Sequence, residues 1–366
     1  TITASQTGDS NYNAATSVPQ PLVVEAAGQT ITFAGTELTG KTFGNGPITL
    51  VAESRAKLDS TLTGLTVAFT SDNPAVATIN ANTLTIVGAG TANITASQAG
   101  NPGFFAAADP VTRVLTVAPA AATVTLGSLA QVYNNTPRAA TAVTDPAGLN
   151  VAFAYTPTGG TASPTAPTAA GSYTVNAMIA GVTPPESNYV GSATGTLVIA
   201  KATQTITFAD ILSPKLVNAG SFSLTATSDA TPTLAVTFTS SNPAVASISG
   251  NIVTIHALGT TTITAKQAGD TNYLPAVDSP QTLVVNPVAP VITSHPALAQ
   301  TAVVGSQFIF GPVTLNALSA PVTFSISGAP TGLVVNPTTG IISGVPSGTP
   351  GPFTIVLTAT NATASD

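Results

Sequence analysis

Apolar and polar residues alternate along most of the chain. Ile31 and Phe33 alternate with threonine in "QTITF", and Leu84 and Ile86 do the same in "TLTI". A period of two places apolar side chains on one face of a β-strand and hydroxyl groups on the other. The alternating runs are short and are separated by Asn-Pro, Gly-Asn or Ala-Gly turns. The pattern therefore predicts antiparallel β-sandwiches of about seven strands.

The alternating pattern is itself repeated along the chain. "DNPAVATIN" at 72–80 recurs as "SNPAVASIS" at 241–249, and "QTITFAGTEL" recurs as "QTITFADIL". The first residues, "TITASQTGDSNYNAATSVPQPLVV", match "TITAKQAGDTNYLPAVDSPQTLVV", which begins at Thr262. The chain thus holds two whole copies of one unit and one partial copy, as tandem arrays of domains do. We interpret the repeated Asn-Pro phrase as a structural corner, because Asn-Pro favours turn initiation.

These boundaries predict five segments. They are residues 1–27, the C-terminal strands of a partial repeat; 28–118, a whole repeat; 119–200, a different unit; 201–287, a second whole repeat; and 288–366, a last unit expected to lack its final strand. The joints are short and two contain proline, so we expect stiff linkers. Four domains in line would form an elongated rod on the order of 150 Å.

Two explanations of residues 1–24 compete. The sequence is a window cut from a longer repetitive polypeptide, or these strands are donated to a neighbouring subunit in a filament. We favour the first, because the strands match the repeated unit better than they match the last one.

Specific phrases carry resemblances to known families. The two whole copies resemble bacterial immunoglobulin-like (Big-type) repeats through "QTITF", "SSNPAVAS" and "TITAKQAGDTNY". The unit between them resembles the MBG family of bacterial surface repeats through "LAQVYNNTPRAATAVTDPAGL" and "NYVGSATGTLVI". The last unit resembles putative Ig domains that accompany cadherin-like repeats, through "GAPTGLVVNPTTGIISGVP". The resemblance implies stalks, adhesins and filament subunits of bacteria, and not catalysis.

The composition excludes further classes of protein function. Only 6% of the 366 residues are charged, whereas roughly 25% are charged in an average soluble domain. The net charge is −6. Nucleic-acid binding needs clustered Lys and Arg, so we expect no nucleic-acid partner. No run of eighteen apolar residues is present, so we expect no membrane insertion of this segment. The absence of cysteine rules out disulfides and suits a protein that crosses an envelope.

Metal or cofactor binding is not predicted. His256 and His295 lie in different units, and His256 occupies the place of Val87 in the first copy. With two histidines in unrelated domains, no acid–His–Ser arrangement can be built, and we expect no catalytic residue and no enzyme.

One repeated loop invites a calcium interpretation. Asp270 and Tyr273 in "AGDTNYLPA" are matched by Asp9 and Tyr12, whereas "AGNPGFFAA" offers Asn101 and Phe104 instead. Calcium needs several oxygen ligands and each loop has one carboxylate, so we interpret the loop as an Asx-turn with an aromatic plug. An ion shared between neighbouring domains stays open, because the loop should lie near a joint.

We expect neither of two covalent modifications for which the sequence offers candidate residues. One is a Lys–Asn cross-link beside a buried acid, for which the candidates are Lys41, Lys57 and Lys266. The other is N-glycosylation at the sequons of Asn93, Asn134 and Asn361, which arise easily in a threonine-rich chain.

The sequence thus favours a structural segment of a long extracellular bacterial surface protein, located outside the cell or on its surface. Its expected partner is itself, through lateral or end-to-end assembly. The alternative is an adhesive module in which one domain binds a glycan or a host protein. Tyr133, Tyr155 and Tyr189 are the candidate sugar platforms, and core packing is the competing interpretation of all three.

Overall fold

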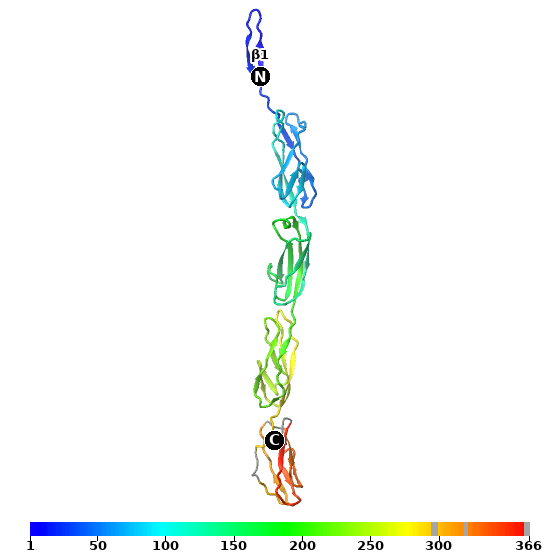
Figure 1. The fold of residues 1–366 in the computed structure, drawn as a ribbon, viewed down its shortest axis with the longest axis vertical. Coiled ribbons are helices and arrows are strands. Elements are labelled where there is room, and N and C mark those ends of the chain that lie inside the picture. The colour runs from blue at the N-terminus through cyan, green and yellow to red at the C-terminus, as the bar shows by residue number, and fades with distance from the viewer. Residues whose placement is uncertain (294–298, 318–320, 362–366) are drawn as a thin grey trace. The chain divides into compact units, whose positions relative to one another are not determined.

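A computed structural model describes residues 1–293, 299–317 and 321–361 (Figure 1). These residues form β-strands, with two short 3-10 helices, η1 (Thr36–Leu38) and η2 (Glu186–Asn188). The all-β prediction is confirmed for this part of the chain. His295 lies outside the described residues.

The chain divides into two compact units. The first consists of Thr1–Gln131, Pro137–Pro167 and Gly171–Val198, and the second of Val132–Thr136, Thr168–Ala170 and Ile199–Asp366. The predicted segment 119–200 therefore contributes Val132–Thr136, Thr168–Ala170 and its last two residues to the second unit.

The first unit begins with an isolated hairpin of β1 (Ile2–Gln6) and β2 (Ala15–Gln20). The strands are antiparallel, with Ile2 opposite Gln20, and every residue in them is exposed. A two-stranded hairpin of this kind is marginally stable at best in water.

The first whole copy follows as a sandwich around Phe33, Leu84, Ile94 and Leu115, which are fully or almost fully buried. Its sheets have the strand orders β4-β11-β10-β7, β5-β9-β8 and β3-β6. The strands are β3 (Gln29–Thr32), β4 (Lys41–Thr42), β5 (Ile48–Thr49), β6 (Glu53–Ala56), β7 (Ala68–Ser71), β8 (Ala77–Asn80), β9 (Thr83–Ile86), β10 (Gly90–Ser97) and β11 (Val111–Ala118). The alternation seen in the sequence thus places the expected side chains in the core.

The second whole copy repeats this topology in the second unit. Its sheets are β21-β28-β27-β24, β22-β26-β25 and β20-β23. Its strands are β20 (Ile206–Phe208), β21 (Lys215–Leu216), β22 (Ser221–Ser223), β23 (Ala226–Ser228), β24 (Thr237–Ser240), β25 (Ala246–Ser249), β26 (Ile252–Ile255), β27 (Gly259–Lys266) and β28 (Ser279–Asn286).

The repeated Asn-Pro phrase forms the same corner in both copies. The Asn242 carbonyl accepts hydrogen bonds from the N–H groups of Val245 and Ala246, at 3.1 and 3.2 Å. The Asn73 carbonyl makes the matching bonds in the first copy. Val245 and Ala246 are buried, so the corner returns the chain directly to the core.

The two remaining domains are also built of short sheets. Residues 119–200 form β14-β19-β17-β16, β13-β15 and β12-β18, and the last domain forms β29-β32-β31 and β30-β33. Their strands are β12 (Ala120–Ala121), β13 (Thr123–Gly127), β14 (Ala130–Val132), β15 (Thr141–Asp145), β16 (Val151–Pro157), β17 (Gly171–Ile179), β18 (Tyr189–Val190), β19 (Ser192–Ala200), β29 (Phe308–Phe310), β30 (Thr323–Ser327), β31 (Leu333–Val335), β32 (Ile342–Gly344) and β33 (Val356–Thr360). The five domain boundaries and the rod stay predictions.

Candidate functional site

In the second copy and in the N-terminal hairpin, the repeated loop is a tight Asx-turn. Asp270 Oδ1 accepts hydrogen bonds from the N–H groups of Asn272 and Tyr273, at 2.7 and 2.8 Å. Asp9 Oδ1 accepts the same two bonds in the hairpin, at 2.8 and 3.0 Å. The carboxylate is thus engaged by its own backbone, as the Asx-turn interpretation predicts.

A buried amide network lies beneath this loop in the second copy. Gln204 Nε2 donates to Gln267 Oε1 at 2.5 Å and to the Leu274 carbonyl at 2.8 Å. Gln204 Oε1 accepts from Ser228 Oγ at 2.6 Å, and Gln267 Oε1 also accepts from the N–H of Gly269. Gln204, Gln267 and Ser228 are all buried, so the network ties the segment just before β20 to the loop.

The first copy contains the same network. Gln29 Nε2 donates to Gln98 Oε1 and to the Ala106 carbonyl, and Gln29 Oε1 accepts from Ser54 Oγ. Sequence reasoning missed these glutamines. The available signal was that glutamine recurs at the start of "QTITF" and just before each loop, at positions that share the parity of the core residues.

The prediction that Phe104 takes the place of Tyr273 is wrong. In the second copy Asp270 and Tyr273 close the turn, whereas in the first Asn101 pairs with Phe105. The first loop is one residue longer because it accommodates Pro102 and Gly103. Phe105 therefore takes the place of Tyr273, and Phe104 is 69% exposed.

In the second unit, the loop lies at a joint between domains, as expected. The Tyr273 ring meets Tyr133 of the preceding domain edge to face, with ring centroids 5.3 Å apart. Tyr273 Oη accepts from the N–H of Thr231 at 2.9 Å, and Asn272 Oδ1 accepts from the N–H of Ala170 at 3.0 Å. Burial raises the pKa of Tyr133, and Tyr273 and Asp270 add to the rise. Two aromatic rings and a paired amide therefore fill this joint.

A second joint, within the first unit, uses other residues for the same purpose. Phe43 of the first copy contacts Tyr189 edge to face, with ring centroids 5.5 Å apart. Asn188 is buried and its Oδ1 accepts from the N–H of Ala89 at 2.8 Å. Each joint therefore combines an aromatic pair with an asparagine that accepts a backbone hydrogen bond.

The candidate tyrosines do not form a sugar platform together. Tyr133 and Tyr155 are buried, and Tyr155 Oη accepts from the N–H of Ala140 at 3.1 Å. Tyr189 packs on Phe43. The core-packing interpretation therefore holds for Tyr155, and joint packing describes Tyr133 and Tyr189.

The remaining candidates have ordinary surface partners. The His256 ring lies 2.7 Å from Ser247 Oγ, in the place that Val87 holds in the first copy. Lys266 pairs with Asp278 at 2.7 Å, and both side chains are about half exposed. Among the described residues, no three His, Asp or Glu side chains gather as metal ligands would.

The sequon asparagines and the other lysines also have identified places. Asn93 Nδ2 donates to Asp72 Oδ2, Asn134 Oδ1 accepts from Thr136, and Asn361 Nδ2 donates to the Val288 carbonyl. Lys57 lies 3.9 Å from Asp109, and Lys41 is half-buried in β4. The Lys57 and Asp109 side chains are well exposed, unlike the buried acid that a Lys–Asn cross-link needs.

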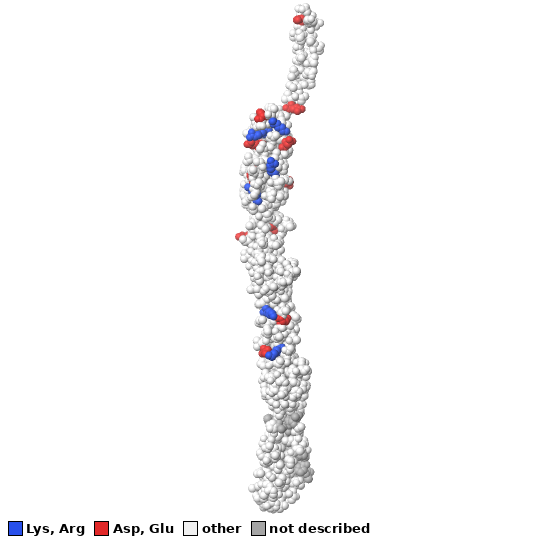
Figure 2. All heavy atoms as spheres, turned by 180° about the vertical axis from the view of Figure 1, so that it is seen from behind, with Lys and Arg blue, Asp and Glu red and all other residues white. Residues whose placement is uncertain are grey.

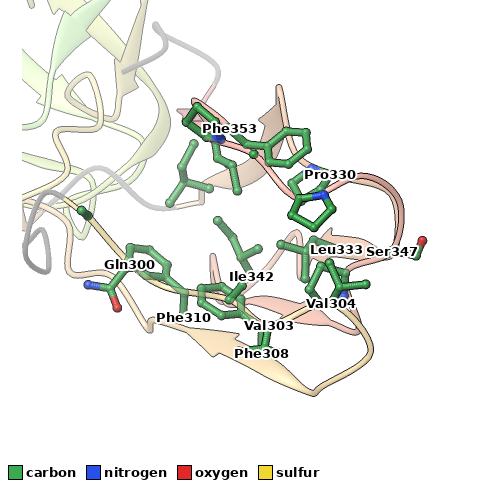
Figure 3. Close-up of a pocket in the computed structure, with 18 of the residues that line it drawn as sticks. Gln300, Val303, Val304, Phe308, Phe310, Pro330, Leu333, Ile342, Ser347 and Phe353 are labelled. Atoms are coloured by element: carbon green, nitrogen blue, oxygen red, sulfur yellow. The ribbon is translucent and has the colours of Figure 1, made fainter.

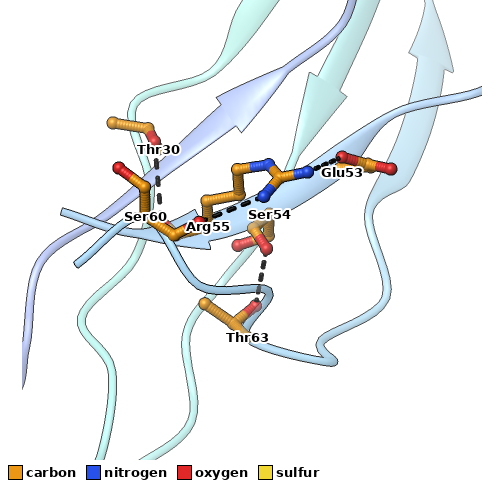
Figure 4. Close-up of polar contacts among 6 residues, drawn as sticks. All are labelled: Thr30, Glu53, Ser54, Arg55, Ser60 and Thr63. Carbon is orange, nitrogen blue, oxygen red and sulfur yellow. Dashed lines mark hydrogen bonds and ion pairs between the residues drawn. The ribbon is translucent and has the colours of Figure 1, made fainter.

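Charge is sparse on the surface, as Figure 2 shows for one face of the molecule. Figure 4 shows polar contacts around Arg55 of the first copy. Arg55 Nη2 donates to Glu53 Oε2 at 2.7 Å, and its Nη1 donates to the Ser60 carbonyl at 3.1 Å.

Asp229 takes the place of Arg55 in the second copy and accepts from the N–H and Oγ1 of Thr205. These two bonds hold the pKa of Asp229 below its usual value, and the bond from the backbone N–H has the larger effect.

The last domain contains an apolar cavity of about 1070 Å³ (Figure 3). Phe308, Phe310, Leu333 and Ile342 point into it from three strands, and Phe353 lines its other side. Between residues 289 and 361 the sequence has no Asp, Glu, Lys or Arg. The polar side chains in the lining are Gln300, Ser347 and Thr349, and glycan binding stays a prediction.

Comparisons with known proteins identify two of the domains. Residues 122–203 match the MBG domain family, and residues 289–366 match the putative Ig domain family. The resemblances predicted for these two regions are thus confirmed, while the Big-type resemblance of the repeats stays a prediction. No curated protein matches the chain.

Solved structures of domain arrays are similar to this chain. Sidekick-1 immunoglobulin domains 1–4 are 13% identical, with 92% of this chain and 97% of that chain covered and a TM-score of 0.30. The insect immune protein hemolin is 14% identical, with 89% and 94% covered and a TM-score of 0.28. The protocadherin GammaB4 extracellular domain is 15% identical at a TM-score of 0.25, with 92% of this chain covered, and the chain spans 65% of its length. Scores this low carry no argument about function.

The chain therefore contains an MBG domain and a putative Ig domain within an all-β array of mainly antiparallel sheets. Such domains are typical of adhesion or structural proteins outside the cell and are typically non-enzymatic. No helix in the described residues is long and apolar enough to cross a membrane.

Proposed function

We propose that this chain is a structural segment of a long bacterial surface protein, in which Ig-like repeats serve as a stiff spacer. The MBG and putative Ig matches support an extracellular structural or adhesive role. The resemblance of the other two domains to Big-type repeats supports a bacterial source. With so little charge to repel neighbouring chains, the sheet edges also favour lateral assembly with further copies.

The joint around Tyr133 is the observation that carries this proposal. Residues Val132–Thr136 and Thr168–Ala170 belong in sequence to one domain, but they pack with the next domain. A buried edge-to-face aromatic pair contributes about 0.5–1.5 kcal/mol beyond its buried area. We expect such a joint to resist bending, which is what a spacer needs and what an independent pair of domains on a flexible tether lacks.

Spin-label distances test the stiffness of this joint. The chain has no cysteine, so labels can be placed at Met178→Cys and Ile252→Cys, two exposed strand positions on either side of the joint. We expect a narrow distance distribution that becomes broad in Tyr133→Ala, because the aromatic pair is lost.

A matched control is Val143→Ala, an exposed position on β15 away from the joint. It should leave the distribution narrow. A distribution already as broad in the unmodified chain as in Tyr133→Ala would overturn the spacer proposal.

A further inference from the structure

Strand β7 of the first copy, with Val67 just before it, has an open backbone edge. β7 is the last strand of the sheet β4-β11-β10-β7. The N–H of Asp72 donates to the Asn93 carbonyl of β10. Because such pairing recurs at every second residue of an antiparallel strand, the backbone groups of Val67 and Phe69 point away from β10. In the described part of the chain, no hydrogen bond reaches these groups.

An uncharged groove of about 720 Å³ lies beside this edge. Leu65, Val67 and Phe69 line one side of the groove and are half-buried. Leu50 and Val51, which follow β5 in the opposite sheet, line the other side, and Val51 is 65% exposed. The open edge therefore has apolar side chains next to its free backbone groups. Strand addition uses this combination of backbone pairing and side-chain contact.

The edge lacks the features that usually prevent sheet edges from pairing. The opposite edge of the same sheet, β4, is two residues long and contains Lys41. Short edge strands, lysine and proline all discourage pairing with another chain. Residues 60–71 contain no Asp, Glu, Lys, Arg or Pro. The β7 edge is therefore the less protected of the two.

The side chains along this edge match themselves under a two-fold rotation. An antiparallel pair of such edges centred on Val67 places Val67 opposite Val67, and Leu65 opposite Phe69 of the other molecule. Residues directly opposite each other in an antiparallel pair have their side chains on the same face, within contact distance. The backbone donors and acceptors are self-complementary in the same arrangement. The natural occupant of this edge is therefore an identical edge.

The second whole copy repeats the same edge. "LTVAFTS" at 65–71 recurs as "LAVTFTS" at 234–240. β24 is the last strand of its sheet, as β7 is. Val236 and Phe238 are half-buried, and no hydrogen bond in the described residues reaches their outward backbone groups. The open, uncharged edge is thus a property of the repeat and not of one domain.

We propose that residues 65–71 pair antiparallel with the same residues of a second molecule of this chain, so that the two sheets become one continuous sheet. The Val67 N–H of each molecule donates to the Val67 carbonyl of the other. Leu65 and Phe69 of each molecule contact each other across the pair and shield both grooves from water. The inference rests on the lateral assembly of the proposed function and identifies its contact.

Thiol cross-linking of the full chain tests this pairing, because the chain has no cysteine of its own. Val67→Cys would place two thiols opposite each other, on Cα atoms about 5.5 Å apart, which a disulfide can span. With a mild oxidant, we expect Val67→Cys to form covalent dimers at least about tenfold faster than Thr70→Cys, because pairing raises the local concentration of the thiols.

Thr70→Cys is the matched control on the same strand. Thr70 is exposed whereas Val67 is half-buried, so random collisions would favour the control. Pairing centred on Val67 leaves the two Thr70 positions roughly 20 Å apart, too far for a disulfide. Sedimentation of the unmodified chain measures self-association independently.

Equal rates in the two variants, or no covalent dimer from Val67→Cys, would overturn the proposed contact. If the unmodified chain self-associates all the same, lateral assembly stands and uses another surface. If it sediments as a monomer, lateral assembly fails together with this contact. The spin-label test of the spacer does not depend on either result.

Discussion

Ile2 and Ile263 occupy the same position of one repeated sequence, yet Ile2 is 63% exposed and Ile263 is fully buried. Their strands have the same register and lead into the same Asx-turn. What differs is the opposite sheet, which covers Ile263 and is lacking over Ile2 in the described residues. Local sequence thus determines the strand, the turn and the apolar face, whereas burial depends on a second layer.

The largest effect expected from this comparison is the loss of a buried aliphatic side chain. Ile263→Ala should lower the free energy of unfolding of its domain by about 2–5 kcal/mol, because it removes a fully buried side chain and leaves a cavity. Ile2→Ala should change stability by less than about 0.5 kcal/mol, as exposed positions usually do.

The measurement must be resolved by domain, because a multi-domain chain has no single free energy of unfolding. Hydrogen exchange of peptides from residues 201–287 and 1–24, at increasing urea, reports each region separately. Equal effects of the two substitutions would show that the hairpin is packed in solution as its counterpart is.

The buried amide network gives a smaller contrast, between Gln204 of the second copy and Gln6 of the hairpin, which is the counterpart of its partner Gln267. Gln204→Leu should destabilise the second copy by about 1–3 kcal/mol, because the buried acceptor of Gln267 and the hydroxyl of Ser228 lose their partner. Gln6→Leu should have little effect on the chain alone, since the Gln6 side chain is exposed. Exchange of the same two sets of peptides checks both, and an unaffected Gln204→Leu domain would mean that water replaces the amide.

Much of the fold could be predicted from the sequence, because the sandwiches use local signals. Ile31, Phe33 and Leu84 alternate with threonine and are buried. The Asn-Pro corner forms where the phrase recurs, at Asn73 and Asn242. Both signals act over a few residues, so they can be recognised in the sequence without knowledge of the rest of the structure.

The joints and the loop register could not be predicted in the same way. Tyr133 and Tyr273 come from different domains, and no local pattern pairs them. Phe104 and Phe105 both offer an aromatic ring after Asn101, and the three-dimensional bridge to Ala27 shows that Phe105 takes the place of Tyr273. A sequence alignment by itself places Phe104 opposite Tyr273, one residue from the correct match. It cannot locate the extra residue of the first loop, because Phe104 and Phe105 are both aromatic.

Acid stability sharpens the comparison between the two whole copies, because each has a hydrogen-bonded aspartate with a lowered pKa at a place where the other copy has a different residue. The backbone N–H of Thr205, and then its hydroxyl, lower the pKa of Asp229 in the second copy. The backbone N–H of Asn93, and then its side chain, lower the pKa of Asp72 in the first copy. The position of Asp72 is held by Ser241 in the second copy, whose Oγ accepts from the N–H of Thr262 at 2.9 Å.

A carboxyl group whose pKa is lowered on folding stabilises the fold above its unfolded value, and this contribution is lost as the pH falls through the lowered folded value. The ordinary pKa of aspartate is 3.8, so the loss begins near that pH and increases on further acidification. Asp72→Ser copies the second domain and should remove part of the acid sensitivity of residues 28–118 alone. Asp229→Asn should do the same for residues 201–287 alone. Hydrogen exchange of each domain from about pH 5 to about pH 2, corrected for intrinsic rates, checks both predictions. If either substitution changed the acid sensitivity of both domains equally, the assignment would be refuted.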